Sequence, residues 1–322
     1  MTRRLDTLTN SYKVELVGPD LSPYREGTGG IPYALTFRAP EPGPHVAISA
    51  IVHGNEPCGA IALDTLLKED VRPRRGTLSF IFVNVAAYES FDPDAPNASR
   101  WLDEDFNRLW SAQTLDGPRQ SSELERARVL RPLLDEIDLL LDIHSMQHKV
   151  EPLMMAGPAP KGVALAKAVG IPRTIVVDQG HAAGPRMRDY GGFISPSSAK
   201  NALLMECGQH WEASAEPLAL ATAVRFLAAT GAVAPDFWAD RITADLAPQR
   251  VLEITHPITI ETEDFHFTEK FVGMDVIADA GTVIAHDGDR PVTTPYPGCV
   301  LIMPSMRLWP GQTAVRLGRY LD

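Results

Sequence analysis

Over roughly the first 245 residues, short apolar runs of strand length alternate with longer segments whose apolar positions follow helical spacing. Apolar or β-branched runs bounded by turn residues predict buried strands, and the longer segments predict helices. The predicted strands are 12–17, 33–38, 45–52, 77–85, 139–144, 173–177 and 202–206. The predicted helices are 57–67, 121–135, which Pro132 is expected to limit, 161–169 and 215–229. This alternation predicts an α/β layered domain with a largely parallel sheet.

The pattern changes near residues 245–250, beyond which no helical spacing is found. Short strand-like runs follow one another there, separated by glycines in turn positions. The predicted strands are 251–260, 265–271, 282–285, 291–294, 299–303 and 313–317. The sequence therefore predicts two domains, a larger α/β domain over residues 1–245 and a small all-β domain over residues 246–322.

Composition narrows the functional classes. The 322 residues are 44% hydrophobic, which is enough for a large core, and carry a formal net charge of −11. That charge argues against a nucleic-acid or anionic-membrane partner, although a few arginines in a cleft still suit an acidic substrate. No signal-peptide pattern and no apolar run of the ~18 residues needed to cross a bilayer is present, so a soluble cytoplasmic protein is expected. Three widely spaced cysteines, Cys58, Cys207 and Cys299, are expected to be free thiols.

The stretch His53-Gly54-Asn55-Glu56 lies between the predicted strand 45–52 and the predicted helix 57–67. Open α/β sheets bind their ligands at the carboxyl ends of strands, where this loop falls. Imidazole nitrogen and carboxylate oxygen are both good zinc ligands. Taken alone, a turn with an incidental histidine explains the stretch equally well, because Gly-Asn is ordinary turn chemistry.

His144 is the candidate for a third ligand, because it also follows an apolar strand. Asp142 lies two residues earlier on the same side of that strand and is expected to orient the imidazole. Glu206 ends another apolar strand, and partial burial there would suit a general base. The alternatives are a surface histidine beside a solvated aspartate and a glutamate in a salt bridge. Cys207 points to the opposite face from Glu206 and is interpreted as a core residue.

A long polar segment, residues 88–120, separates the predicted strand 77–85 from the next helix. Long loops in compact domains are usually functional or disordered. Arg100, Asn107 and Arg108 lie in it, and a guanidinium suits a carboxylate or a developing oxyanion. The alternative is a surface network of arginine and aspartate side chains.

Four motifs occur in the order found in the succinylglutamate desuccinylase/aspartoacylase family, whose members are relatives of the zinc carboxypeptidases. They are His53-Gly54-Asn55-Glu56, Asp105-Phe106-Asn107-Arg108, Asp142-Ile143-His144 and the strand that ends in Glu206. The resemblance covers nearly the whole chain. It implies a zinc-carboxypeptidase-like α/β/α domain with a mixed, largely parallel sheet, and a small C-terminal all-β domain near the mouth of the site.

The resemblance also implies roles for individual residues. His53, Glu56 and His144 would bind one zinc ion per chain, Glu206 would be the general base, and Arg100 would stabilise the oxyanion. Asn107 and Arg108 would hold a substrate carboxylate. The family's further substrate-binding arginine and tyrosine cannot be placed, and four candidates remain: Arg186, Arg188, Tyr190 and Lys200. Three histidines near these motifs receive no chemical role, and His181 is the one considered for the pocket wall; they are His148, His181 and His210.

The resulting hypothesis is a zinc-dependent amidohydrolase that cleaves the amide bond of an N-acyl amino acid or a similar small carboxylate. The sequence does not identify the acyl group or the amine of the substrate, and it leaves open whether the protein forms a homo-oligomer. A zinc carboxypeptidase acting on peptides would need the same ligands and the same carboxylate clamp. A non-catalytic ligand-binding protein on this scaffold is the alternative of a different class.

Overall fold

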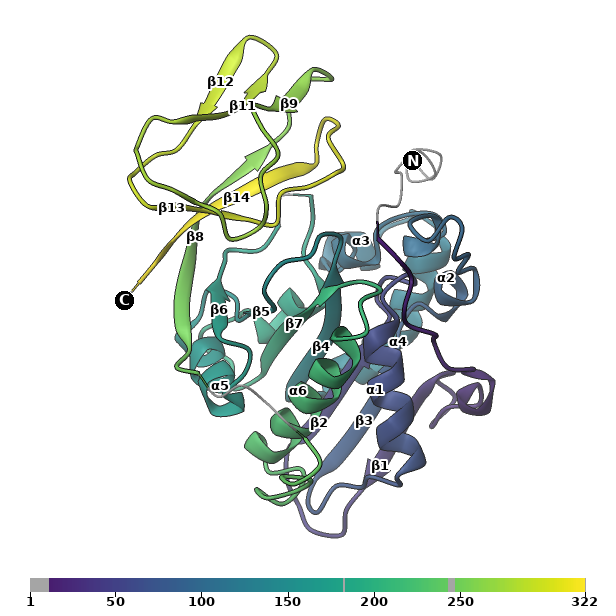
Figure 1. Cartoon of the computed structure of the whole chain (residues 1–322). Helices are drawn as coiled ribbons and strands as arrows, with labels where there is room; N and C mark the ends of the chain where they lie inside the picture. The colour runs from purple at the N-terminus through teal and green to yellow at the C-terminus, as the bar shows by residue number, and fades with distance from the viewer. Residues whose placement is uncertain (1–11, 182, 243–246, 322) are drawn as a thin grey trace.

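The computed structural model describes residues 12–181, 183–242 and 247–321. In this part of the chain a mixed sheet of 11 strands runs through the molecule (Figure 1). In spatial order its strands are β1 (Ala34–Arg38), β3 (Thr77–Phe82), β2 (His45–Ala50), β4 (Leu139–Met146), β7 (Asn201–Gln209), β5 (Leu153–Met155), β6 (Thr174–Val177), β8 (Arg250–Thr259), β14 (Thr313–Tyr320), β13 (Cys299–Ile302) and β10 (Val276–Ile277). A second, antiparallel sheet holds β12 (Arg290–Thr293), β11 (Val283–Asp287) and β9 (Phe265–Phe267).

Helices cover both faces of the central strands. The helices are α1 (Pro57–Lys68), α2 (Val85–Glu89), α3 (Ala112–Leu115), α4 (Ser122–Glu136), α5 (Pro160–Val169) and α6 (Ala215–Ala229). Apolar side chains of α1, α5 and α6 form one core with the sheet, and those of α4 form a second core. Strands buried on both faces are apolar throughout rather than alternating, which explains why β2, β4 and β7 read as continuous hydrophobic runs.

The strands at the centre of the sheet are parallel: β3, β2, β4 and β7 pair side by side in this order. Their carboxyl ends therefore lie at one edge of the sheet, where the loops after them meet. β1 and β5 are antiparallel to their neighbours β3 and β7, so the sheet is mixed. The predicted α/β layered fold with a largely parallel sheet is confirmed.

The C-terminal region is built of antiparallel strands around a small core of its own, as the sequence predicts. β8 pairs in parallel with β6 and antiparallel with β14, so backbone hydrogen bonds join this region to the α/β layers. The predicted boundary between residues 245 and 246 lies outside the described residues. The division into two domains stays a prediction.

Several local predictions are wrong, among them the strand 265–271, which ends at Phe267. Residues 12–17 form no strand, and Glu15 instead donates one backbone hydrogen bond to the carbonyl of Trp211, at 3.0 Å. The predicted strand 77–85 ends at Phe82, because the chain turns into α2 at Val85. α4 continues past Pro132. The strands β5 and β10 are too short to show a periodicity that the sequence would reveal.

Within the described ranges, no helix has the length and apolar character that crossing a membrane requires.

Candidate metal centre and its pocket

Three side chains converge at the carboxyl edge of the sheet. After β2 the chain turns at Ile51, which has a positive φ of 53°, and carries His53 and Glu56 into the loop before α1. His144 comes from β4. The three residues are buried, and one ligand atom from each lies within 4.8 Å of the others. Two imidazoles and a carboxylate at this spacing form a donor set that fits a single divalent metal ion.

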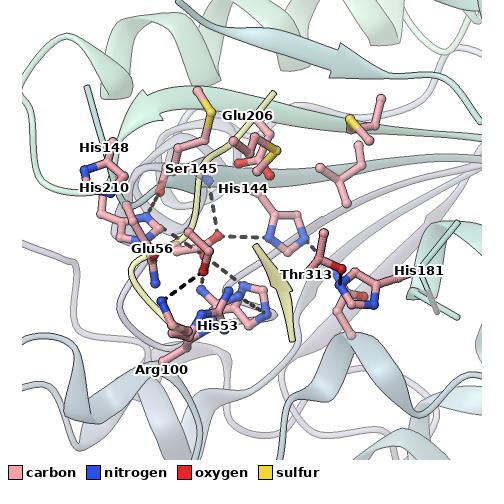
Figure 2. A pocket seen from close by; sticks show the side chains of 18 of the residues that line it. His53, Glu56, Arg100, His144, Ser145, His148, His181, Glu206, His210 and Thr313 are labelled. Atoms are coloured by element: carbon pink, nitrogen blue, oxygen red, sulfur yellow. Dashed lines mark hydrogen bonds and ion pairs between the residues drawn. The ribbon is translucent and has the colours of Figure 1, made fainter. Parts of the chain in front are cut away.

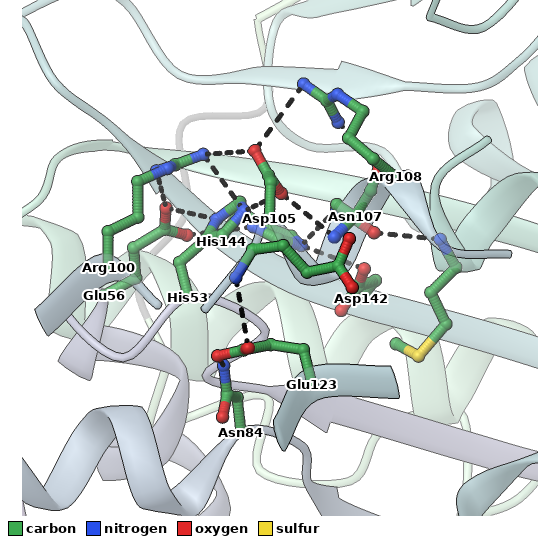
Figure 3. A network of polar contacts seen from close by, with 12 residues as sticks. His53, Glu56, Asn84, Arg100, Asp105, Asn107, Arg108, Glu123, Asp142 and His144 are labelled. Carbon is green, nitrogen blue, oxygen red and sulfur yellow. Dashed lines mark hydrogen bonds and ion pairs between the residues drawn. The ribbon is translucent and has the colours of Figure 1, made fainter. Parts of the chain in front are cut away.

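A second layer of carboxylates orients the two imidazoles, as Figure 3 shows. Nδ1 of His53 and Nδ1 of His144 face the Glu56 carboxylate, at 2.7 and 2.9 Å. Their Nε2 atoms face Asp105 at 3.0 Å and Asp142 at 2.9 Å. Metal-binding histidines usually donate their second N–H to a carboxylate in this way. Asp142 thus lies where the strand period places it, whereas the matching role of Asp105 was not found from the sequence.

Opposite charges in this cluster shift one another's pKa values. Burial alone would raise the pKa of the Glu56 carboxyl, but the charges and hydrogen bonds of His53 and His144 hold that pKa well below its ordinary value. Burial opposes protonation of His144, yet Asp142 and Glu56 hold the pKa of its imidazole well above the ordinary value. Glu56 therefore stays ionised beside the two imidazoles, as a carboxylate that binds a cation must.

Gly54 has no room for a side chain. A Cβ at this position would lie 2.3 Å from the carbonyl carbon of Ala87 and 2.5 Å from the carbonyl oxygen of Ser99. Because both are backbone atoms, Gly54→Ala must displace the turn that carries His53 and Glu56. We expect the variant to lose about 2 kcal/mol of stability and to bind zinc more weakly. Thermal unfolding and zinc titration measure both effects, and wild-type values for both would show that the turn tolerates the methyl group.

The polar segment predicted to be functional is anchored by Glu123 in the first turn of α4. The buried Glu123 carboxylate accepts backbone N–H bonds from Leu102, Asp103 and Glu104 and a side-chain bond from Asn84 (Figure 3). These contacts hold the chain between Arg100 and Asp105. No signal in the sequence distinguishes Glu123 from a carboxylate that complements a helix N-terminus.

Arg100, Asn107 and Arg108 all line the pocket. Arg100 donates to Glu56 Oε1 at 3.1 Å, and its Nη2 lies 3.0 Å from His53 Nε2. Asn107 Oδ1 accepts from the backbone N–H of Met187 at 2.8 Å, so its amide is held in a fixed orientation.

Glu206 lies beside His144 in the register of β7 and β4. Its side chain is 7% exposed, and its Oε2 atom has no hydrogen-bond partner among the described residues. Burial raises the pKa of Glu206 to about 8. A carboxylate that faces a pocket without a partner is available to exchange a proton there.

Figure 2 shows the pocket around these groups. His181 lines it, as considered from the sequence, and its Nε2 lies 3.1 Å from Thr313 Oγ1 of β14. His148 and His210, which receive no chemical role from the sequence, also line the pocket. The sequence did not place them there because they lie in loops after β4 and β7 without a motif of their own.

Of the four candidates for a further substrate-binding residue, only Arg186 lines the pocket. Its guanidinium forms ion pairs with the carboxylates of Asp178 and Asp189. The others bind elsewhere: Arg188 contacts Asp189 and the carbonyls of Ala156 and Ala202, Tyr190 donates to Asp135, and Lys200 donates to the carbonyls of Asp135 and Ile137.

Two arginines of the C-terminal region were missed and line the pocket, Arg307 between β13 and β14 and Arg316 on β14. Arg316 lies between the buried Val315 and Leu317, and an arginine inside an apolar strand could have indicated a functional residue.

The three cysteines are buried and free, as predicted.

Comparisons with known proteins agree with this geometry. Residues 42–230 match the family model "Succinylglutamate desuccinylase/Aspartoacylase catalytic domain". No curated protein matches the sequence. Among solved structures, a succinylglutamate desuccinylase from Vibrio parahaemolyticus is 18% identical in sequence and superposes with a TM-score of 0.64. The match includes 90% of this chain and 87% of the Vibrio chain.

Two further structures share the fold. The ectoine utilization protein EutE (DoeB) from Ruegeria pomeroyi, in a product-bound structure, is 18% identical, with a TM-score of 0.59 and 97% coverage of both chains. Murine aminoacylase 3 is 16% identical, with a TM-score of 0.59, and covers 88% of this chain and 97% of its own. The family model spans more than half of the chain, and it includes every residue of the His53, Glu56 and His144 cluster. This chain therefore belongs to the succinylglutamate desuccinylase/aspartoacylase family.

Proposed function

We propose that this protein is a zinc-dependent amidohydrolase that cleaves the amide bond of an N-acyl amino acid or a similar small carboxylate. One observation carries the proposal. A buried His/Glu/His cluster shares its pocket with the unpartnered carboxylate of Glu206 and with several guanidinium groups. Membership in a family of metal-dependent deacylases supports it.

His53, Glu56 and His144 would hold the zinc ion through Nδ1, the carboxylate and Nδ1. Bound zinc would polarise the scissile carbonyl and acidify a water molecule. Asp105 and Asp142 keep the second nitrogen of each imidazole occupied, which leaves Nδ1 directed at the metal position.

The other side chains of the pocket have separate roles in the proposed reaction. Glu206 takes the proton of the attacking water and returns it to the leaving amine. Arg100 lies next to the ligands and stabilises the negative charge that develops on the carbonyl oxygen. Arg108 and the Nδ2 amide of Asn107 hold the substrate by a carboxylate near the scissile bond.

The test is amine release from N-acetyl, N-succinyl and N-formyl amino acids by zinc-loaded protein. We expect turnover of at least one member, and loss of that turnover after chelation. Release of C-terminal residues from peptides, with no turnover in this panel, would replace the proposal with a carboxypeptidase. Zinc binding without turnover of either substrate type would favour a non-catalytic role.

The metal ligands can be tested separately from activity. His144→Gln is expected to reduce bound zinc from one ion per chain to a small fraction, because two remaining ligands bind zinc poorly. Metal analysis after dialysis measures the loss, and His256→Gln, at an exposed position of β8, is the control. Full zinc content in the His144 variant would place the ion elsewhere.

A further inference from the structure

The ammonium group of Lys161, in the first turn of α5, lies in a cage of backbone carbonyls. It donates to the carbonyl oxygens of Gly192 at 3.1 Å, Ser195 at 2.6 Å and Ser198 at 3.0 Å, and to that of Lys200. All four oxygens come from one segment, the cage loop of residues 191–200. An ammonium group has three N–H bonds, so four acceptors exceed what directional hydrogen bonds from one lysine can serve.

The cage holds a cation by carbonyl dipoles rather than by a negative charge. Among the described residues Lys161 forms no ion pair with a carboxylate, and the charged group that affects it is the guanidinium of Arg188. Burial, together with the charge of Arg188, lowers the pKa of the Lys161 ammonium. Carbonyl oxygens grouped in this way replace the hydration shell of K+ in other proteins. The ammonium therefore occupies a site with the chemistry of a monovalent-cation site.

The cage loop depends on the cation for its shape. The four carbonyl dipoles point their negative ends at one another, which is unfavourable unless positive charge lies between them. The loop is also tightly folded, because a Cβ at Gly192 would lie 2.7 Å from Ser198 Oγ. The backbone N–H of Lys200 donates to the same hydroxyl oxygen at 3.1 Å. Removal of the ammonium would leave the oxygens facing one another, and the loop would open.

The segment just before the cage loop contacts the stretch of chain that carries Asn107. The backbone N–H of Met187 donates to Asn107 Oδ1 at 2.8 Å. Tyr190, directly before the cage loop, packs edge-on against Trp110, with the ring centroids 5.4 Å apart. Opening of the cage loop would disturb both contacts, and the amide of Asn107 would lose its fixed orientation.

We propose that Lys161 is a positioning residue that serves as a built-in monovalent cation. Its ammonium holds the cage loop in the shape that orients Asn107, and the same cage becomes a binding site for K+ when the lysine side chain is removed. The part of the inference that concerns Asn107 rests on the proposed function, whereas the cage itself does not. With the cage filled by its own lysine, the wild-type protein needs no K+.

Thermal unfolding in different salts tests the cage without turnover. In LiCl we expect zinc-loaded Lys161→Ala to unfold roughly 5 °C below wild type, and KCl at the same concentration to restore most of this difference. Li+ is too small to contact four oxygens at these distances. Wild type should unfold at one temperature in both salts, as should Lys167→Ala, the control at an exposed position of the same helix.

Equal unfolding temperatures of Lys161→Ala in LiCl and KCl overturn the cage as a cation site. If this variant does not fold in LiCl, KCl should restore the folded protein, and failure to fold in either salt contradicts the proposal as well. Lys161→Met retains most of the apolar stem and lacks only the charged end, so it separates the ammonium from the packing of the stem.

Kinetics test the positioning role, because a purely structural lysine would not act on one kinetic parameter. We expect KM to rise on the order of tenfold in Lys161→Met, the value of one hydrogen bond to a charged group, with kcat near that of wild type. In Lys161→Ala the same rise should be reversed by KCl and not by LiCl. A wild-type KM in Lys161→Met, or one KM for Lys161→Ala in both salts, removes the link to Asn107.

The outcomes distinguish this proposal from the proposed reaction. An unfolding temperature of Lys161→Ala that depends on K+, without turnover of any N-acyl amino acid, keeps the cage and removes the reaction. The Kd of an N-acetyl amino acid then replaces KM in the comparison of variants. Turnover by wild type, with no effect of K+ on the unfolding temperature or the KM of Lys161→Ala, keeps the reaction and removes the cage.

Discussion

Glu206→Gln is expected to bind zinc normally and to lose turnover by about 10²–10⁴-fold. The amide has nearly the shape of the carboxylate, so the pocket stays intact, but it cannot accept the proton of the attacking water. Because Glu206 Oε2 has no partner among the described residues, the substitution breaks no hydrogen bond of that atom. Steady-state kinetics with the best substrate of the panel, together with zinc analysis, measure the effect.

Glu216→Gln, an exposed glutamate in the first turn of α6, is the control and should retain wild-type activity. Retained turnover in the Glu206 variant would remove this residue from the mechanism. Loss of zinc together with turnover would assign Glu206 a part in holding the metal instead.

Glu123→Gln is expected to destabilise the protein by about 3 kcal/mol and to lower kcat, although Glu123 does not line the pocket. Its two oxygens accept four N–H groups, which come from Asn84 and from residues 102–104. A glutamine replaces one oxygen by an NH2 group, which faces N–H donors and leaves them unpaired. The chain between Arg100 and Asp105 would then lose its anchor.

Chemical unfolding measures the stability change, and kinetics measure the displacement of Arg100. Glu125→Gln, an exposed carboxylate in the same turn of α4, controls for the lost charge at the helix N-terminus. Wild-type kcat in a destabilised Glu123 variant would show that the anchor serves stability alone. An unchanged unfolding free energy would contradict the assigned role.

Several parts of the site follow from short-range pattern. His53 and His144 come after apolar strands, and parallel strands bring their carboxyl ends to one edge, so a shared site is predictable without coordinates. The position of Asp142 follows from the two-residue period of a strand. His181 was also within reach of the sequence, since it lies in the loop after a predicted strand.

Other parts depend on contacts between segments far apart in the chain. Asp105 lies 52 residues from His53, and Glu123 binds the loop that precedes its own helix. A buried carboxylate in the first turn of a helix looks in sequence like one that complements the helix dipole. For residues 12–17 the local pattern was misleading. It suits a strand, but in the structure these residues pair with no strand and Glu15 only donates a backbone hydrogen bond to Trp211.

The sequence by itself determined the α/β layers and indicated the His53, Glu56 and His144 cluster and the carboxylate of Glu206, because strand and helix periods and strand ends are local properties. Only the tertiary structure decided what surrounds them. It placed Arg188, Tyr190 and Lys200 away from the pocket and brought Arg307 and Arg316 of the C-terminal region to its lining. The physical reason is that β8 pairs with β6, and no local pattern specifies which strand edge a later strand will find.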